Sequence, residues 1–171
     1  MATIAATFER PRTDLQRVLL AGATVAFLDG LFAVVLYVFI VQSTTAGRIF
    51  QGIAAGLIGR TAALNGGAQT VALGLALHCT VAFGWTTIYY VLLNRLDWLR
   101  DAVETTRGKL IVGALFGATI WLGMNYVVVP LAGLKVAPLS GWRFWVQLVW
   151  HMIALGPPIV AIVRTDSGGS R

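Results

Sequence analysis

Four strongly polar side chains, Asp29, His78, Asn125 and His151, each lie inside a different long apolar segment of this chain. An ionisable side chain at membrane depth is costly, so it usually faces other helices and often carries a function. A carboxyl group and two imidazoles can exchange protons, because histidine changes its charge near neutral pH and a neighbouring carboxylate tunes that change. These residue types therefore predict a buried polar cluster that handles protons or other cations.

The candidate cluster comprises Asp29, His78, Asn125, Gln147 and His151, with Gln147 one helical turn before His151. Asn and Gln side chains often join membrane helices by hydrogen bonds, so Asn125 and Gln147 are interpreted as structural. Asp29 needs a partner, because an unpaired carboxylate at that depth is expensive. Its estimated depth differs from that of either histidine by no more than about 6 Å, at 1.5 Å per residue. Asp29, His78 and His151 are therefore predicted to lie within reach of one another.

Two other functions remain open. In an accessory or structural subunit of a larger membrane complex, the same polar residues would only join helices. A haem or a metal ion between His78 and His151 would suit two helices that run in the same direction with their histidines at similar depth. Two ligands without supporting residues are weak evidence, so no metal ligand and no resident cofactor are assigned. Motifs for nucleotide binding, metalloproteases, hydrolases and redox thiols are missing from the sequence, so an enzyme is not predicted and no catalytic residue is named.

The segments that carry these residues are long enough to cross a bilayer. Apolar residues make up 57% of the chain and charged residues 12%, against about 25% charged in a soluble domain. The apolar segments have lengths of about 30 Å or more, and they span residues 17–41, 69–93, 109–129 and 143–163. The fold class predicted is all-α: a single polytopic membrane domain over residues 1–171, with four transmembrane helices in a bundle.

The connections between these segments carry a second pattern. Apolar residues recur at helical spacing over residues 46–59, which predicts a short amphipathic or re-entrant helix on the outer side. Residues 1–16 form a polar tail that we place in the cytoplasm. The Ser/Gly-rich segment 165–171 is predicted to be disordered.

Arginine and lysine residues are distributed unequally between the two sides. Nine lie on the side of the termini and of the connection after the second span, against four on the other side. This asymmetry predicts a multi-pass protein with both termini in the cytoplasm. The net charge of +6 is spread between apolar segments and forms no basic face, so nucleic acid is not an expected partner. The expected partner is the lipid bilayer, and stripes of small residues also suit a homo-oligomer or subunits of a membrane complex.

Several short motifs resemble the YagU-like family of uncharacterised bacterial inner-membrane proteins. The motifs are His78-Cys-Thr-Val-Ala-Phe-Gly, Gly113-Ala-Leu-Phe-Gly, Pro130-Leu-Ala-Gly-Leu and Val149-Trp-His-Met, and the resemblance covers about residues 67–164. It implies a multi-pass architecture in the bacterial inner membrane and places His78 and His151 at histidines of the family pattern. It implies no reaction.

Overall fold

The computed structural model describes residues 13–135 and 140–163. Almost all of these residues are helical and none of them forms a strand, so the predicted all-α class is confirmed. The predicted disordered tail at 165–171 lies outside the described residues, as does most of the predicted tail at 1–16.

Four long helical segments are each long and apolar enough to cross a membrane, and they extend over Asp14–Ile40, Gly67–Arg95, Thr106–Leu131 and Trp142–Ile162. Their ends differ from the predicted bounds by three residues at most. Three of the four contain a turn of π-helix. They are built from α1 (Asp14–Val34) with η1 (Val35–Ile40); α4 (Gly67–Arg95); α6 (Thr106–Gly123) with η2 (Met124–Val128) and α7 (Val129–Leu131); and α8 (Trp142–Trp150) with η3 (His151–Leu155) and α9 (Gly156–Ile162).

Three shorter helices occupy the connections: α2 (Ala46–Ile58), α3 (Arg60–Asn65) and α5 (Asp97–Ala102). The bounds of α2 match the helix predicted at 46–59, whereas α3 was not predicted. Gly59 separates α2 from α3 with a φ of 81°, a conformation that side chains with a Cβ rarely adopt. One surface segment therefore folds as two helices with different directions.

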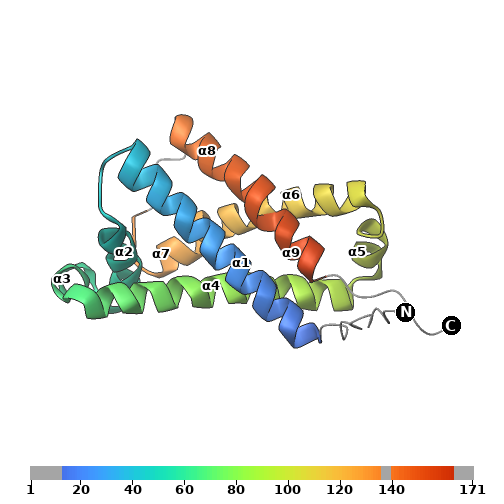
Figure 1. Cartoon of the computed structure of the whole chain (residues 1–171), viewed down its shortest axis with the longest axis horizontal. Coiled ribbons are helices and arrows are strands. Elements are labelled where there is room, and N and C mark those ends of the chain that lie inside the picture. Colours follow the sequence, from blue (N-terminus) through green and yellow to red (C-terminus); the bar gives the residue numbers. More distant parts are fainter. Residues whose placement is uncertain (1–12, 136–139, 164–171) are drawn as a thin grey trace, which may run out of the picture.

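The long helices alternate in direction along the chain. Figure 1 shows α2 and α3 together at one end of the molecule, and α5 at the other end with the beginning of α1 and the end of α9. The helix α1 packs against α4 and α9, while α6 packs against α9 and η3. Residues from three different spans can therefore meet beside α1.

Glycines bring α6 and the last span into backbone contact. A Cβ on Gly156 would overlap the carbonyl oxygen of Gly113, and a Cβ on Gly117 would overlap the carbonyl oxygen of His151. Small residues at such positions let membrane helices approach closely. The position of the His151 backbone is thus set by direct contact with α6.

A buried polar network holds α2 and α3 on α4. The Gln51 side-chain amide donates to the Thr70 hydroxyl oxygen at 3.2 Å and to the Gly67 carbonyl at 3.3 Å. The Thr70 hydroxyl donates to the Ala63 carbonyl at 2.7 Å. Because each buried polar group here has a partner, the network adds specificity without the penalty of an unpaired donor. Gly74 also lets α4 touch the backbone of α2 at Phe50.

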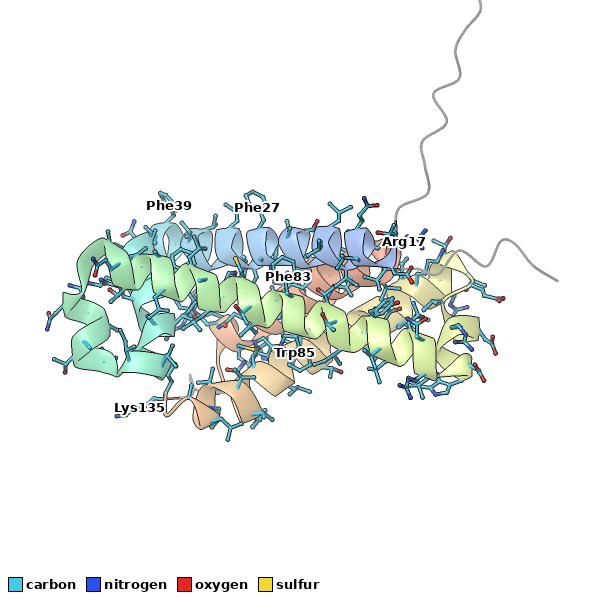
Figure 2. All side chains as sticks on the ribbon, turned by 90° about the horizontal axis from the view of Figure 1, so that it is seen from below. Arg17, Phe27, Phe39, Phe83, Trp85 and Lys135 are labelled. Atoms are coloured by element: carbon cyan, nitrogen blue, oxygen red, sulfur yellow. The ribbon has the colours of Figure 1, made fainter. Side chains whose placement is uncertain are left out.

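The outward faces of the spans are strongly apolar. In the most apolar part of each span only 17–28% of the residues are buried inside the protein. Figure 2 shows Phe27 and Phe39 pointing away from α1, whereas Phe83 lies between α1 and α4. An apolar surface of this extent suits contact with lipid or with another apolar chain.

The contact at Gly156 yields a prediction about stability. Gly156→Ala should lower the free energy of unfolding by about 1–3 kcal/mol, because the added methyl group must push α6 and α9 apart. The matched control is Gly84→Ala, since a Cβ on Gly84 meets no atom within 4 Å. Reversible unfolding of the purified proteins in mixed detergent micelles measures the free energy of unfolding of both variants. Equal stability of the two variants would contradict the close backbone contact.

Candidate functional site

The structure places Asp29 between the two histidines of the chain. Asp29 Oδ2 lies 4.0 Å from His78 Nδ1, and Asp29 Oδ1 lies 3.8 Å from His151 Nε2. Asp29 comes from α1, His78 from α4, and His151 from the first position of η3. Three of the five candidate residues, each on a different span, therefore come together in one cluster.

The imidazole of His78 is held by the backbone of α1. Its Nε2 lies 2.9 Å from the carbonyl oxygen of Ala26, one turn before Asp29. The ring of Phe50, from α2, packs edge-on against the imidazole with 6.0 Å between ring centroids. A carbonyl oxygen can only accept a hydrogen bond, so Nε2 carries the proton and Nδ1 is the nitrogen that faces Asp29.

The imidazole of His151 is held by its own helix, and the ring nitrogens have the opposite roles to those in His78. Its Nδ1 lies 2.7 Å from the carbonyl oxygen of Gln147 and donates to it, which leaves Nε2 facing Asp29. The preceding Trp150 stacks on Phe32 of α1, with ring centroids 4.6 Å apart and planes only 7° from parallel. These two contacts fix both the direction of the ring and its distance from α1.

A π-helical turn begins at His151. The backbone N–H of Gly156 donates to the His151 carbonyl, five residues back, and Pro157 and Pro158 follow at once. Prolines have no backbone N–H, so the helix cannot continue with regular bonding across them. The interruption takes the form of one widened turn, His151–Leu155. Such turns are frequent at functional sites.

The hydrogen bonds to Ala26 and Gln147 decide how the cluster can hold protons. Each neutral imidazole presents a lone pair to Asp29, and an ionised carboxylate can only accept. Three acceptors facing one another repel, so the arrangement is favourable only with a proton or another cation among them. The separations of 3.8 and 4.0 Å exceed hydrogen-bond lengths. A direct bond from Asp29 to either ring therefore needs a shift of about 1 Å, or a bridging water.

Access to the cluster is uneven. The side chain of Asp29 is 33% exposed, against 12% for His78 and 11% for His151. The carboxyl group is thus the most accessible member of the cluster, while both imidazoles are nearly enclosed.

Asn125 and Gln147 are satisfied within their own helices. The Asn125 amide donates to the Trp121 carbonyl at 2.9 Å, and the Gln147 amide donates to the Arg143 carbonyl at 3.2 Å. Within residues 13–135 and 140–163 neither side chain forms a hydrogen bond with the cluster. Gln147 serves the cluster only through its backbone carbonyl, which accepts from His151.

The geometry gives little support to haem or metal binding. In the described part of the chain, no group of three or more His, Cys, Asp and Glu side chains is arranged to hold a metal ion. Asp29 lies between the two imidazoles, where a haem would have to sit, and His78 Nε2 is occupied by the Ala26 carbonyl.

Several residues that shape the site were not foreseen from the sequence. They are the carbonyl of Ala26 and the aromatic rings of Phe32 and Phe50. An aromatic residue in an apolar segment has no signature that separates a site wall from general packing, and a backbone carbonyl has no sequence signature at all. Gly113 and Gly117, which allow the close helix contact behind His151, are small residues spaced one turn apart, a pattern typical of packed membrane helices.

The chain matches no protein-family model, no curated protein and no solved structure. The resemblance to the YagU-like proteins therefore stays a prediction.

The two histidines should occupy opposite neutral tautomers. His78 should carry its proton on Nε2 and His151 on Nδ1, because those nitrogens face carbonyl oxygens. The chain has only these two histidines, so ¹⁵N spectra of histidine-labelled protein in micelles resolve them. His78→Gln assigns the signals by removing one set. The same tautomer for both rings would show that one of these hydrogen bonds is absent.

Proposed function

We propose that this chain is a multi-pass membrane protein in which Asp29, His78 and His151 share a proton within the membrane. The observation that carries the proposal is the placement of the Asp29 carboxyl between one nitrogen of His78 and one nitrogen of His151. In each ring the other nitrogen donates to a backbone carbonyl. Backbone carbonyls fix the orientation of both rings, so the proton-accepting nitrogens face the carboxyl group in advance.

Four long apolar helices with largely apolar outer surfaces support the membrane assignment. We place the protein in a bacterial inner membrane, as the YagU-like resemblance implies, with the four spans forming a bundle. The helix α2 then lies in the outer interface and covers His78 through Phe50.

The chemistry is a transfer of one proton among three bases. When Asp29 is protonated, its O–H can donate to the lone pair of His151 Nε2 or of His78 Nδ1. Transfer breaks the O–H bond and forms an N–H bond, which leaves a carboxylate beside an imidazolium. That pair is neutral overall, so the charge buried in the membrane does not increase. The more exposed Asp29 is the entry point, and the two enclosed rings are alternative acceptors.

The accessory-subunit alternative has one specific observation in its favour. The hydrogen bond from His78 on α4 to Ala26 on α1 joins two spans, as expected of a polar residue that only holds helices together. The two proposals differ in what happens when the carboxyl group is removed, because a purely structural cluster has no need to exchange a proton.

Asp29→Asn should reduce proton uptake. When purified protein in weakly buffered detergent is stepped from about pH 8 to about pH 5, the range in which histidine titrates, a pH-indicator dye reports the protons bound. Asp29→Asn should bind fewer protons than the unaltered protein while keeping its helical content, because an amide preserves the shape of the carboxyl group and cannot be protonated in this range.

Gln147→Leu and Asn125→Leu serve as controls, since neither side-chain amide hydrogen-bonds to the cluster. Both should take up as many protons as the unaltered protein. The proton-sharing proposal fails if Asp29→Asn and Asp29→Leu both fold and take up as many protons as the unaltered protein. The accessory-subunit hypothesis is then favoured.

Reporter fusions test the proposed orientation. A fusion after Arg100 should report the cytoplasm and a fusion after Lys135 the opposite side, because the nine-to-four excess of Arg and Lys favours cytoplasmic termini. Arg100 lies in α5 and Lys135 follows α7, and these two helices lie toward opposite ends of the molecule. A cytoplasmic signal at Lys135 would invert the topology.

A further inference from the structure

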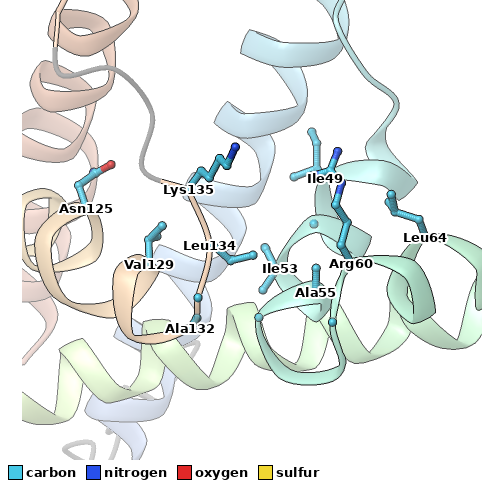
Figure 3. Close-up of a pocket in the computed structure, with 14 residues that line it drawn as sticks. Ile49, Ile53, Ala55, Arg60, Leu64, Asn125, Val129, Ala132, Leu134 and Lys135 are labelled. Atoms are coloured by element: carbon cyan, nitrogen blue, oxygen red, sulfur yellow. The ribbon is translucent and has the colours of Figure 1, made fainter.

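A pocket of about 1000 Å³ lies at the end of the molecule that carries α2 and α3. Its walls come from α2 and α3, from η2 and α7, and from the connection that follows α7 (Figure 3). This volume is at the upper end of the range of small-ligand pockets, about 300–1,000 Å³. The proton-sharing cluster does not line it, so the pocket is a separate feature.

Two unpaired cations border this pocket. Figure 3 shows the side chains of Arg60 and Lys135 with their charged ends directed to the same side. Neither forms an ion pair or a hydrogen bond with the residues that the structure describes. By contrast, Arg48 at the same end donates to the Leu64 carbonyl at 2.9 Å and has a structural role. The pocket therefore has two positive charges without an internal partner.

The segments around the pocket provide no acidic side chain to neutralise them. None of the residues that line the pocket is Asp or Glu. The connections at this end, residues 42–66 and 132–141, also contain no Asp or Glu. Both cations are exposed, so an anion from outside the chain can reach them.

Apart from Asn125, the other side chains that line the pocket are apolar. Ile49 and Ile53 of α2 face Val129 and Leu134 across it, and glycines and alanines fill the gaps between these side chains. A small soluble anion would leave this surface in contact with water. An anion attached to an apolar chain covers both parts of the pocket at once.

We propose that this pocket binds an anionic phospholipid. The phosphate lies between Arg60 and Lys135, and an acyl chain runs along Ile49, Ile53 and Val129. Juxtamembrane cations attract anionic headgroups at about 1 kcal/mol per Lys or Arg, and the apolar wall supplies the chain contact. The Asn125 side chain, which also lines the pocket, adds a polar group near the headgroup.

The first experiment measures the charge requirement. Purified protein in a neutral detergent is titrated with dioleoyl phosphatidylglycerol or dioleoyl phosphatidylcholine, and native mass spectrometry counts the bound lipid. The anionic lipid should bind more tightly. Arg60→Gln and Lys135→Gln should each weaken its binding about fivefold, the equivalent of about 1 kcal/mol. Arg143→Gln, which removes an exposed charge at the same end but outside the pocket, should leave it unchanged.

The second experiment measures the contribution of the apolar wall. Gly52 lines the pocket, and a Cβ built on it meets no atom within 4 Å, so Gly52→Leu places a bulky side chain against the apolar wall without a clash at its Cβ. This variant keeps both cations and should lose most of the phospholipid binding. Inorganic phosphate, tested as a competitor, should displace the lipid only weakly. Equal binding of the two lipids, unchanged binding in Gly52→Leu, or full displacement by phosphate would overturn the proposal.

Discussion

A carboxyl group in the middle of an apolar helix needs polar partners from other helices, and the arrangement of this protein follows from which groups pair with Asp29. Two spans supply one imidazole nitrogen each, at 4.0 and 3.8 Å. Each ring is oriented toward Asp29 by a hydrogen bond from its other nitrogen to a backbone carbonyl oxygen. The backbones of α1 and α8 are therefore as much a part of the cluster as the side chains.

Close backbone approach makes this geometry attainable. Lipid offers no hydrophobic drive for one apolar helix to pack on another, so van der Waals contact between backbones matters more here than in water. Gly117 and Gly156 let α6 press directly on the turn that begins at His151, and Gly74 brings α2 over His78. The ring of Phe50 then packs against His78, and the ring of Phe32 stacks on Trp150, which precedes His151. Small residues position the helices, and large rings fill what remains.

The helices themselves were predictable, because an apolar run of more than twenty residues has few other ways to satisfy its backbone. The approach of Asp29 to both histidines also followed from depth and from the cost of an unpaired carboxylate. Other features depend on three-dimensional detail. The predicted helix at 46–59 corresponds to α2, but hydropathy does not register the second helix, α3, that follows the break at Gly59. Asn125 and Gln147 share the polarity of the cluster residues, yet each amide is satisfied one turn back along its own helix. Residue type alone does not separate that local bond from a bond across helices.

The different nitrogens used by the two rings have a consequence for which amino acids can stand in for each histidine. At position 78 the donor to Ala26 is Nε2, the distal ring nitrogen, and a glutamine amide reaches about as far from the backbone. At position 151 the donor to Gln147 is Nδ1, the proximal one, and asparagine is the closer match in length. The amide side chain that best replaces histidine therefore differs between the two positions. Gln at position 78 and Asn at position 151 would therefore be the substitutions that keep both hydrogen bonds to the backbone and leave the helix packing intact.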